Sequence, residues 1–87
     1  MAIKVMLTGR LADILGKEVH LSSPKTVKEA VKEIATINEE ARAFLLDDKG
    51  EIKDNIIILL KEENVEDLDH PLQEEDELFL LLPIAGG

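Results

Sequence analysis

The residues best suited to chemistry stand at the end of the chain, in the run Ala85-Gly86-Gly87. A terminal carboxylate is a poor electrophile because its charge is delocalised and its oxygens leave badly, so acyl chemistry at Gly87 requires activation, for example by adenylation. Two glycines without a Cβ let an extended tail enter a narrow channel and let a partner's backbone approach closely. The run therefore predicts a tail that a partner activates, although glycines are also common at inert, frayed chain ends.

Side chains elsewhere offer few alternatives. The chain has no cysteine, which excludes disulfides, thiolate nucleophiles and Cys-ligated metals. His20 and His70 lie far apart in sequence, and the carboxylates between Glu62 and Glu77 lack the spacing of an acid–base pair or of a cation-binding loop. We expect no catalytic side chain, no metal site and no bound cofactor, and we interpret the acidic stretch as a solvated surface.

The composition indicates one acidic globular domain. Its 87 residues are 45% hydrophobic and 33% charged, and the formal net charge is −9. This charge disfavours nucleic acid and anionic lipid and favours a basic protein partner. Phe44 and Phe79 are the two aromatic residues, too few for base stacking. Because neither a signal-peptide pattern nor an apolar run of membrane-spanning length is present, we expect a cytoplasmic location.

The first part of the chain predicts a hairpin and then a helix. Apolar residues alternate over 3–8 and over 18–21, which predicts two strands, with Gly9 closing the first and a turn or brief helical turn between them. Thr26 followed by Glu29 is a capping-box signature for the start of a helix. The apolar stripe of that helix consists of Val27, Ala30, Val31 and Ile34.

The segment after this helix predicts a second helical stretch and a strand. Thr36 or Asn38 would end the main helix, and residues 39–46 would form the shorter stretch. A strong turn signal follows, and residues 56–60 then form a continuous apolar run rich in β-branched residues. Such a run is typical of a central strand.

The last part of the chain completes the sheet. Residues 62–77 predict a loop-rich region with one short strand near Val65, and residues 78–82 predict the final strand. Pro83 would end that strand because it has no backbone N–H to donate. The order of elements predicts an α+β fold of the β-grasp type, a mixed sheet packed on one main helix.

The final strand also suggests where a partner docks. We expect a domain over residues 1–82 and a projecting tail over 83–87. The strand is apolar on both faces, whereas one covering helix requires only one apolar face. Phe79 and Leu81 are the candidates for a docking face, on the assumption that the inward residues are Leu78, Leu80 and Leu82. The alternative is that a loop or the second helical stretch covers this face.

These motifs resemble the MoaD/ThiS-type sulfur-carrier family, which includes the small subunit of molybdopterin synthase and the thiamine-pathway sulfur carrier and is ubiquitin-like. The ending Leu82–Gly87 is similar to the family's Pro-Pro-hydrophobic-small-Gly-Gly terminus, and the segment Gly9–Lys17 is similar to its first connection. Thr26-Val27 matches its helix start. The length of the chain favours the molybdopterin synthase branch, since thiamine carriers are usually shorter.

Three positions depart from the family pattern. Glu74–Glu77 stands where Asp-Gly-Asp-Glu is common, Glu63-Asn64-Val65 stands where Asn-Gly is frequent, and Leu82 replaces the first proline. These changes affect turns and the base of the tail. They retain the terminal glycines and leave the pathway open.

The resemblance implies a cycle of activation and sulfur transfer. A ubiquitin-activating-type adenylating enzyme would use ATP to adenylate Gly87, a sulfur donor would convert it to a thiocarboxylate, and the molybdopterin synthase large subunit would use that sulfur for the molybdenum or tungsten cofactor. The catalytic groups would belong to these partners. The expected partner-binding residues are Phe79, Leu81, Pro83, Ile84, Ala85 and Gly86.

Three alternatives remain open from the sequence. The chain could be a ubiquitin-like modifier conjugated to lysines, a sulfur carrier for thiamine or tRNA thiolation, or a plain interaction domain with an inert tail.

Overall fold

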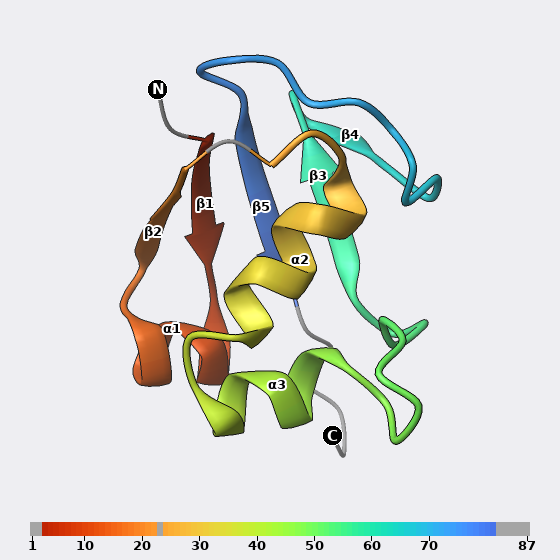
Figure 1. The fold of residues 1–87 in the computed structure, drawn as a ribbon. Helices are drawn as coiled ribbons and strands as arrows, with labels where there is room; N and C mark the ends of the chain where they lie inside the picture. The colour runs from red at the N-terminus through yellow and green to blue at the C-terminus, as the bar shows by residue number, and fades with distance from the viewer. Residues whose placement is uncertain (1–2, 23, 82–87) are drawn as a thin grey trace.

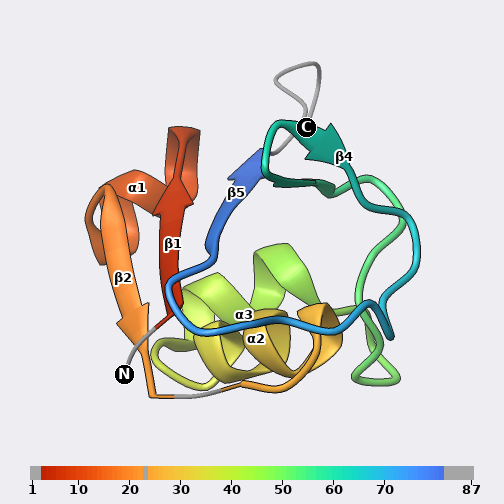
Figure 2. The same cartoon turned by 90° about the horizontal axis from the view of Figure 1, so that it is seen from above.

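The computed structural model describes residues 3–22 and 24–81, and its main feature is one mixed five-stranded sheet with helices α2 and α3 against one face (Figures 1 and 2). The strands are β1 Ile3–Leu7, β2 Glu18–Leu21, β3 Ile57–Leu60, β4 Glu63–Asn64 and β5 Glu77–Leu81. The helices are α1 Gly9–Leu15, α2 Val27–Ala35 and α3 Glu39–Leu45.

The strand order is β2-β1-β5-β3-β4, in which β1 and β5 are parallel and all other pairs are antiparallel. This arrangement confirms the α+β class and the mixed sheet. The prediction that residues 56–60 form the central strand is wrong, because β5 takes that place by pairing with β1 and β3. Strand β3 pairs with β4 through only two residues, Leu59 and Leu60, so it lies near the edge.

The main helix begins as its capping box predicts. The Thr26 side chain accepts a hydrogen bond from the Glu29 N–H at 3.2 Å, and the Glu29 carboxylate accepts one from the Lys25 N–H at 3.1 Å. The helix ends at Thr36, one of its two predicted ends. Asn38 instead caps α3, because its side chain accepts a hydrogen bond from the Glu40 N–H at 2.7 Å.

The connection between β1 and β2 is more helical than expected. Gly9 does not close the first strand; it is the first residue of α1, and its φ of +59° turns the extended chain at Thr8 into the helix. A side chain at Gly9 would meet no other atom within 4 Å, so the backbone conformation is what favours glycine here.

The acidic stretch is tied to the start of α2. The first N–H groups of a helix have no partner within it. Here the Val27 N–H donates to the His70 carbonyl at 3.1 Å and the Lys28 N–H donates to the Leu68 carbonyl at 2.8 Å. The loop after β4 therefore crosses the N-terminus of α2 (Figure 2) and accepts hydrogen bonds from its first two backbone N–H groups. The short strand expected near Val65 is β4, just before this loop.

The turn between β3 and β4 consists of Lys61 and Glu62, both with positive φ (54° and 69°). This is the two-residue hairpin turn that favours Asn-Gly. The resemblance to the family predicts that Glu63-Asn64-Val65 stands in place of the Asn-Gly turn. In the structure the turn lies two residues earlier, at Lys61 and Glu62.

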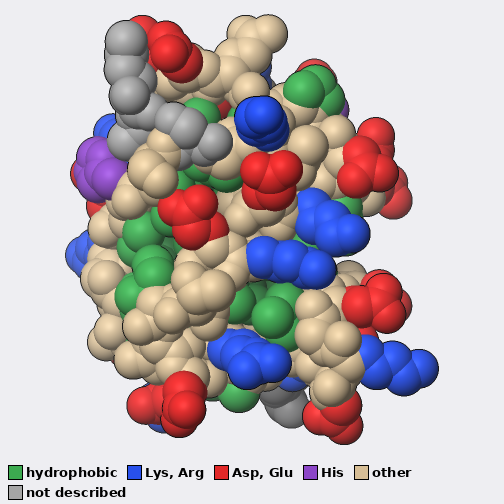
Figure 3. Space-filling view, viewed as in Figure 1, with side chains coloured by type: hydrophobic (Ala, Val, Ile, Leu, Met, Phe, Trp, Pro, Cys, Tyr) green, Lys and Arg blue, Asp and Glu red, His purple; other side chains and the backbone are tan. Residues whose placement is uncertain are grey.

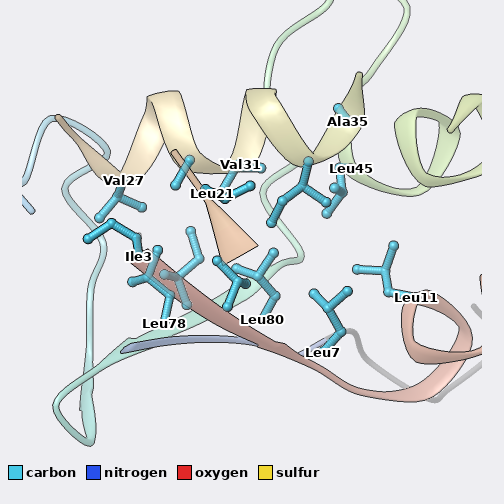
Figure 4. Packing of buried hydrophobic residues seen from close by; sticks show 14 of the residues in the cluster. Ile3, Leu7, Leu11, Leu21, Val27, Val31, Ala35, Leu45, Leu78 and Leu80 are labelled. Carbon is cyan, nitrogen blue, oxygen red and sulfur yellow. The ribbon is translucent and has the colours of Figure 1, made fainter. Parts of the chain in front are cut away.

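The core lies between the sheet and the helices and is aliphatic (Figure 4). Its buried residues are Ile3, Val5, Leu7, Leu11, Leu21, Val27, Ala30, Val31, Ile34, Ala35, Ala41, Leu45, Ile58, Leu60, Leu78 and Leu80. All four residues of the predicted helix stripe are among them. None of the helices in the described segments is long and apolar enough to cross a membrane.

Candidate functional site

The tail that the sequence predicts to be activated lies outside the described residues. This applies to the predicted attachment residue, Gly87, and to Leu82, Pro83, Ile84, Ala85 and Gly86. The structure describes the chain up to Leu81, the last residue of β5, which lies two residues before Pro83, the first residue of the predicted tail.

The end of β5 is held on both sides. Toward β3, Leu81 is the register partner of Ile57. Toward β1, Leu80 is the partner of Leu7, and its carbonyl accepts a hydrogen bond from the Thr8 hydroxyl at 3.3 Å. Leu81, two residues before the predicted tail, thus belongs to the middle of the sheet.

Side chains of β5 alternate between the two faces, as a strand requires. Leu78 and Leu80 are fully buried against the helices, which confirms the assumption that they point inward. Phe79 and Leu81 are half-buried and point to the opposite face. Both predicted docking residues therefore lie on the face of the sheet that α2 does not cover.

Neighbouring strands extend this face on either side of Phe79. Met6 of β1 and Leu59 of β3 are its register partners, and Ile57 is the partner of Leu81. Met6 and Leu59 are half-buried, while Ile57 is 43% exposed. We call this set, Met6, Ile57, Leu59, Phe79 and Leu81, the open face.

Three members of the open face were missed by the sequence reasoning. Ile57 and Leu59 belong to an apolar run on both faces of β3, so the argument used for Phe79 would have found them. Lys4 and Met6 occupy the two outward positions of β1. An apolar side chain at one of them is itself a sign of a partly apolar outer face. Their juxtaposition depends on strand register.

The second helical stretch does not cover the open face. Helix α3 packs beside α2 and α1, and its Ala41 and Leu45 belong to the core on the helix side. Among the described residues, the partly buried apolar side chains packed on that core include Phe44 and Leu46 but no member of the open face. The alternative that α3 covers this face is thereby wrong.

Polar side chains border the open face. Lys4 and Glu77 are register partners and form an ion pair of 3.7 Å between Nζ and Oε2. His20 on β2 contacts Glu18 at 2.6 Å between Nε2 and Oε2. All four side chains are substantially exposed, so these pairs contribute little to stability. They place polar side chains along one side of the apolar open face, as at the rim of protein interfaces.

The charge of the molecule is unevenly placed. Residues 62–77 contain nine of the nineteen acidic residues and no Lys or Arg, while the other ten acidic residues are matched by ten basic ones. The helix side of the molecule shows Lys or Arg side chains interspersed with Asp and Glu (Figure 3). The whole formal net charge therefore resides in residues 62–77, from the β3–β4 turn to the start of β5.

The acidic residues are not arranged as a metal centre in the described part of the chain, where no group of three or more His, Asp or Glu side chains could hold an ion. Asp76 is the one buried charged residue there, 8% exposed. Its carboxylate accepts a hydrogen bond from the Gln73 N–H at 2.7 Å and lies 3.9 Å from Lys61 Nζ. It closes the turn before β5.

Comparisons with known proteins agree on one type of protein. The model of the ThiS family matches residues 5–87. No curated protein sequence matches the chain significantly. The crystal structure of SAMP1 from Haloferax volcanii superposes with a TM-score of 0.87 at 26% identity, covering 100% of both chains.

Two further solved structures are similar. The small archaeal modifier protein 1 (SAMP1) from Methanosarcina acetivorans has a TM-score of 0.84 at 25% identity, covering 99% of this chain and 96% of that one. A Pyrococcus furiosus protein provisionally described as molybdopterin converting factor, subunit 1, has a TM-score of 0.76 at 19% identity, covering 97% and 99%. The last likeness concerns the fold alone. Together these structures establish the ubiquitin-like β-grasp fold.

Proposed function

The chain belongs to the ThiS family of small ubiquitin-like carrier proteins, and from that premise we propose that it carries sulfur as a thiocarboxylate on Gly87, as the small subunit of a molybdopterin synthase. The sulfur would be donated in the synthesis of the molybdenum or tungsten cofactor. The length of the chain supports this branch over the thiamine branch.

The observation that carries the proposal is the continuity between the open face and the tail. Leu81 belongs to the open face, and residue 82 follows it directly. A partner that docks on Phe79 and Leu59 is therefore adjacent to the start of the tail, and its active site needs to lie only a tail's length away. Six residues from 82 to 87 span at most about 20 Å when extended.

The proposed chemistry uses only the carboxylate of this chain. The Gly87 carboxylate attacks the α-phosphate of ATP in a ubiquitin-activating-type enzyme, which gives an acyl adenylate and releases pyrophosphate. Sulfur at the sulfide level from a donor then displaces AMP and leaves a thiocarboxylate. The thiocarboxylate sulfur then bonds to the cofactor precursor in the large subunit, and water cleaves the bond between Gly87 and that sulfur, so Gly87 returns as a carboxylate. The partners supply all acid–base and metal chemistry.

Intact-mass analysis tests this proposal. The chain is incubated with a family adenylating enzyme, ATP and sulfide, and the expected product is heavier by the replacement of one oxygen by sulfur. The matched control lacks Gly86 and Gly87 and should remain unchanged in mass while keeping the folded spectrum of the domain. An unmodified full chain, with an enzyme active on its own carrier, would contradict the proposal.

A second candidate function is supported by the likeness to SAMP1, which is described as a small archaeal modifier protein in both structures. The same acyl adenylate could be attacked by a lysine amine of a target protein, forming an isopeptide bond and releasing AMP. Digestion of cell extract should then yield target peptides bearing a remnant of the Gly-Gly tail. Absence of such peptides, together with thiocarboxylate formation, would leave the carrier function.

A further inference from the structure

Thr8 stands where β1 leaves the sheet. In the parallel β1–β5 ladder, the Lys4 N–H donates to the carbonyl of Asp76, the residue before its register partner Glu77. Four residues further along both strands, this pattern brings position 8 opposite the Leu80 carbonyl. The donor found there is the Thr8 hydroxyl, 3.3 Å from that oxygen and partly buried. A side chain thus extends the ladder by one step beyond the strand.

This use of the hydroxyl is unusual for its position. Thr8 is the N-cap residue of α1, where a threonine normally accepts a hydrogen bond from an N–H of the first helical turn. Here the side chain makes no such cap. The hydroxyl is directed at β5 instead, and Gly9 then turns the chain away into α1.

The Leu80 carbonyl lies immediately before Leu81, the last described residue. On its other side β5 is held by the pairing of Leu81 with Ile57. Within the described residues, the donor that reaches β5 from the β1 side beyond the Leu7–Leu80 pair is the Thr8 hydroxyl, so this hydroxyl holds the end of β5 on that side. Strand ends held from one side open more readily than those paired on both.

We propose that Thr8 is a positioning residue for the activation of Gly87, because its hydroxyl fixes the point from which the tail extends. This inference rests on the proposed function. Opening of one strand residue changes the reach of the tail by about 3.3 Å. A change of this size in the reach of the tail is as large as the separation of about 3 Å at which reacting groups must be held. Loss of the hydroxyl should therefore slow the reaction, while the open face still binds the enzyme.

The test compares three variants in adenylation by a family activating enzyme with ATP and sulfide, followed as pyrophosphate release. Thr8→Val removes the hydroxyl and keeps the shape, and Thr8→Ser keeps the hydroxyl. Thr36→Val is the matched control, since the Thr36 hydroxyl also donates to a carbonyl, that of Glu33 at 2.7 Å, but at the end of α2. Amide hydrogen exchange at Leu80 and Leu81 is measured on the same proteins.

The expected result is a kcat that falls about three- to tenfold in Thr8→Val, with KM for the carrier within about twofold of wild type. Exchange at Leu81 should quicken in the same variant. Thr8→Ser should restore both readouts, and Thr36→Val should leave both unchanged.

Several results would overturn the inference. One is a Thr8→Val variant with wild-type kcat or unchanged exchange at Leu81; another is a rise in KM alone, which would place the effect in docking. A Thr8→Ser variant as slow as Thr8→Val would assign the effect to the methyl group. These outcomes all require a wild-type chain that is adenylated, whereas a wild-type chain that is not adenylated contradicts the proposed function itself.

Discussion

Ile57 of β3 and Leu81 of β5 are register partners at the end of the sheet where the tail begins. Ile57 is 43% exposed, the most exposed large apolar side chain of the open face. Because this pair joins the open face to the tail, a partner that engages one is brought to the other. Under the proposed function, the apolar contact and the C-terminal residues therefore act as one binding unit.

Substitution of Ile57 tests this unit. Ile57→Ser should weaken binding to the activating enzyme or the synthase large subunit about fivefold, because burial of its exposed part contributes about 1 kcal/mol. Ile37→Ser is the matched control, since Ile37 is 52% exposed but follows α2 on the helix side. Titration calorimetry measures both. Equal losses in the two variants would argue against the open face as the docking site.

Glu75 occupies a backbone conformation that favours glycine. Its φ is +68°, in the turn where the family pattern has Asp-Gly-Asp-Glu. Glu75→Gly should stabilise the domain by about 0.5–1 kcal/mol, since the relief of strain exceeds the entropy cost of glycine. Urea unfolding measures the change. Glu74→Gly, without a positive φ to relieve, should be neutral or destabilising; stabilisation by both would exclude this explanation.

Asp76 should be structurally important despite its charge. Its carboxylate accepts the Gln73 N–H, and its backbone carbonyl accepts the Lys4 N–H that opens the β1–β5 ladder. Asp76→Ala should destabilise the domain by about 1–3 kcal/mol, because the Gln73 N–H loses its partner. The exposed Asp67, which accepts the Asp69 N–H, provides the control. Asp67→Ala should cost less in thermal unfolding, and a reversed order would contradict the role of Asp76.

The charge of residues 62–77 should act on association rates. Association with a basic partner should slow as salt rises from about 50 to about 300 mM, and this dependence should be shallower after removal of three charges there. The variant is Glu62→Gln, Glu63→Gln and Glu66→Gln. The control removes three acidic charges from the α3–β3 loop, as Asp48→Asn, Glu51→Gln and Asp54→Asn. Stopped-flow kinetics measures the association rates. An equal change in the salt dependence of the control variant would contradict a specific role for residues 62–77.

Local signals predict α2, α3 and the pleat of β5, but they indicate only a turn or a brief helical turn where α1 lies. The capping box at Thr26 and the apolar stripe from Val27 to Ile34 involve residues within one or two helical turns, so both can be predicted from the sequence. The alternation that buries Leu78 and Leu80 was equally local. These elements also fix the side of β5 on which Phe79 lies.

The pairing of strands that are far apart in the chain could not be predicted from the sequence. The central position of β5 depends on its pairing with β1, at the other end of the chain, and the pairing of Phe79 with Met6 and Leu59 depends on the resulting register. The turn at Lys61 and Glu62 was missed because neither residue type signals a positive φ. The hydroxyl of Thr8 could have been expected at a helix cap, but not on a neighbouring strand.

The pairing of β1 with β5 also constrains synthesis. Leu7 is made long before its partner Leu80, so the middle of the sheet cannot close on the ribosome until β5 has emerged. Pairings of such high contact order form late. A prematurely terminated chain would lack both the central strand and the terminal glycines. Under the proposed function, a chain that stops before β5 could neither close the sheet nor present Gly87 for activation.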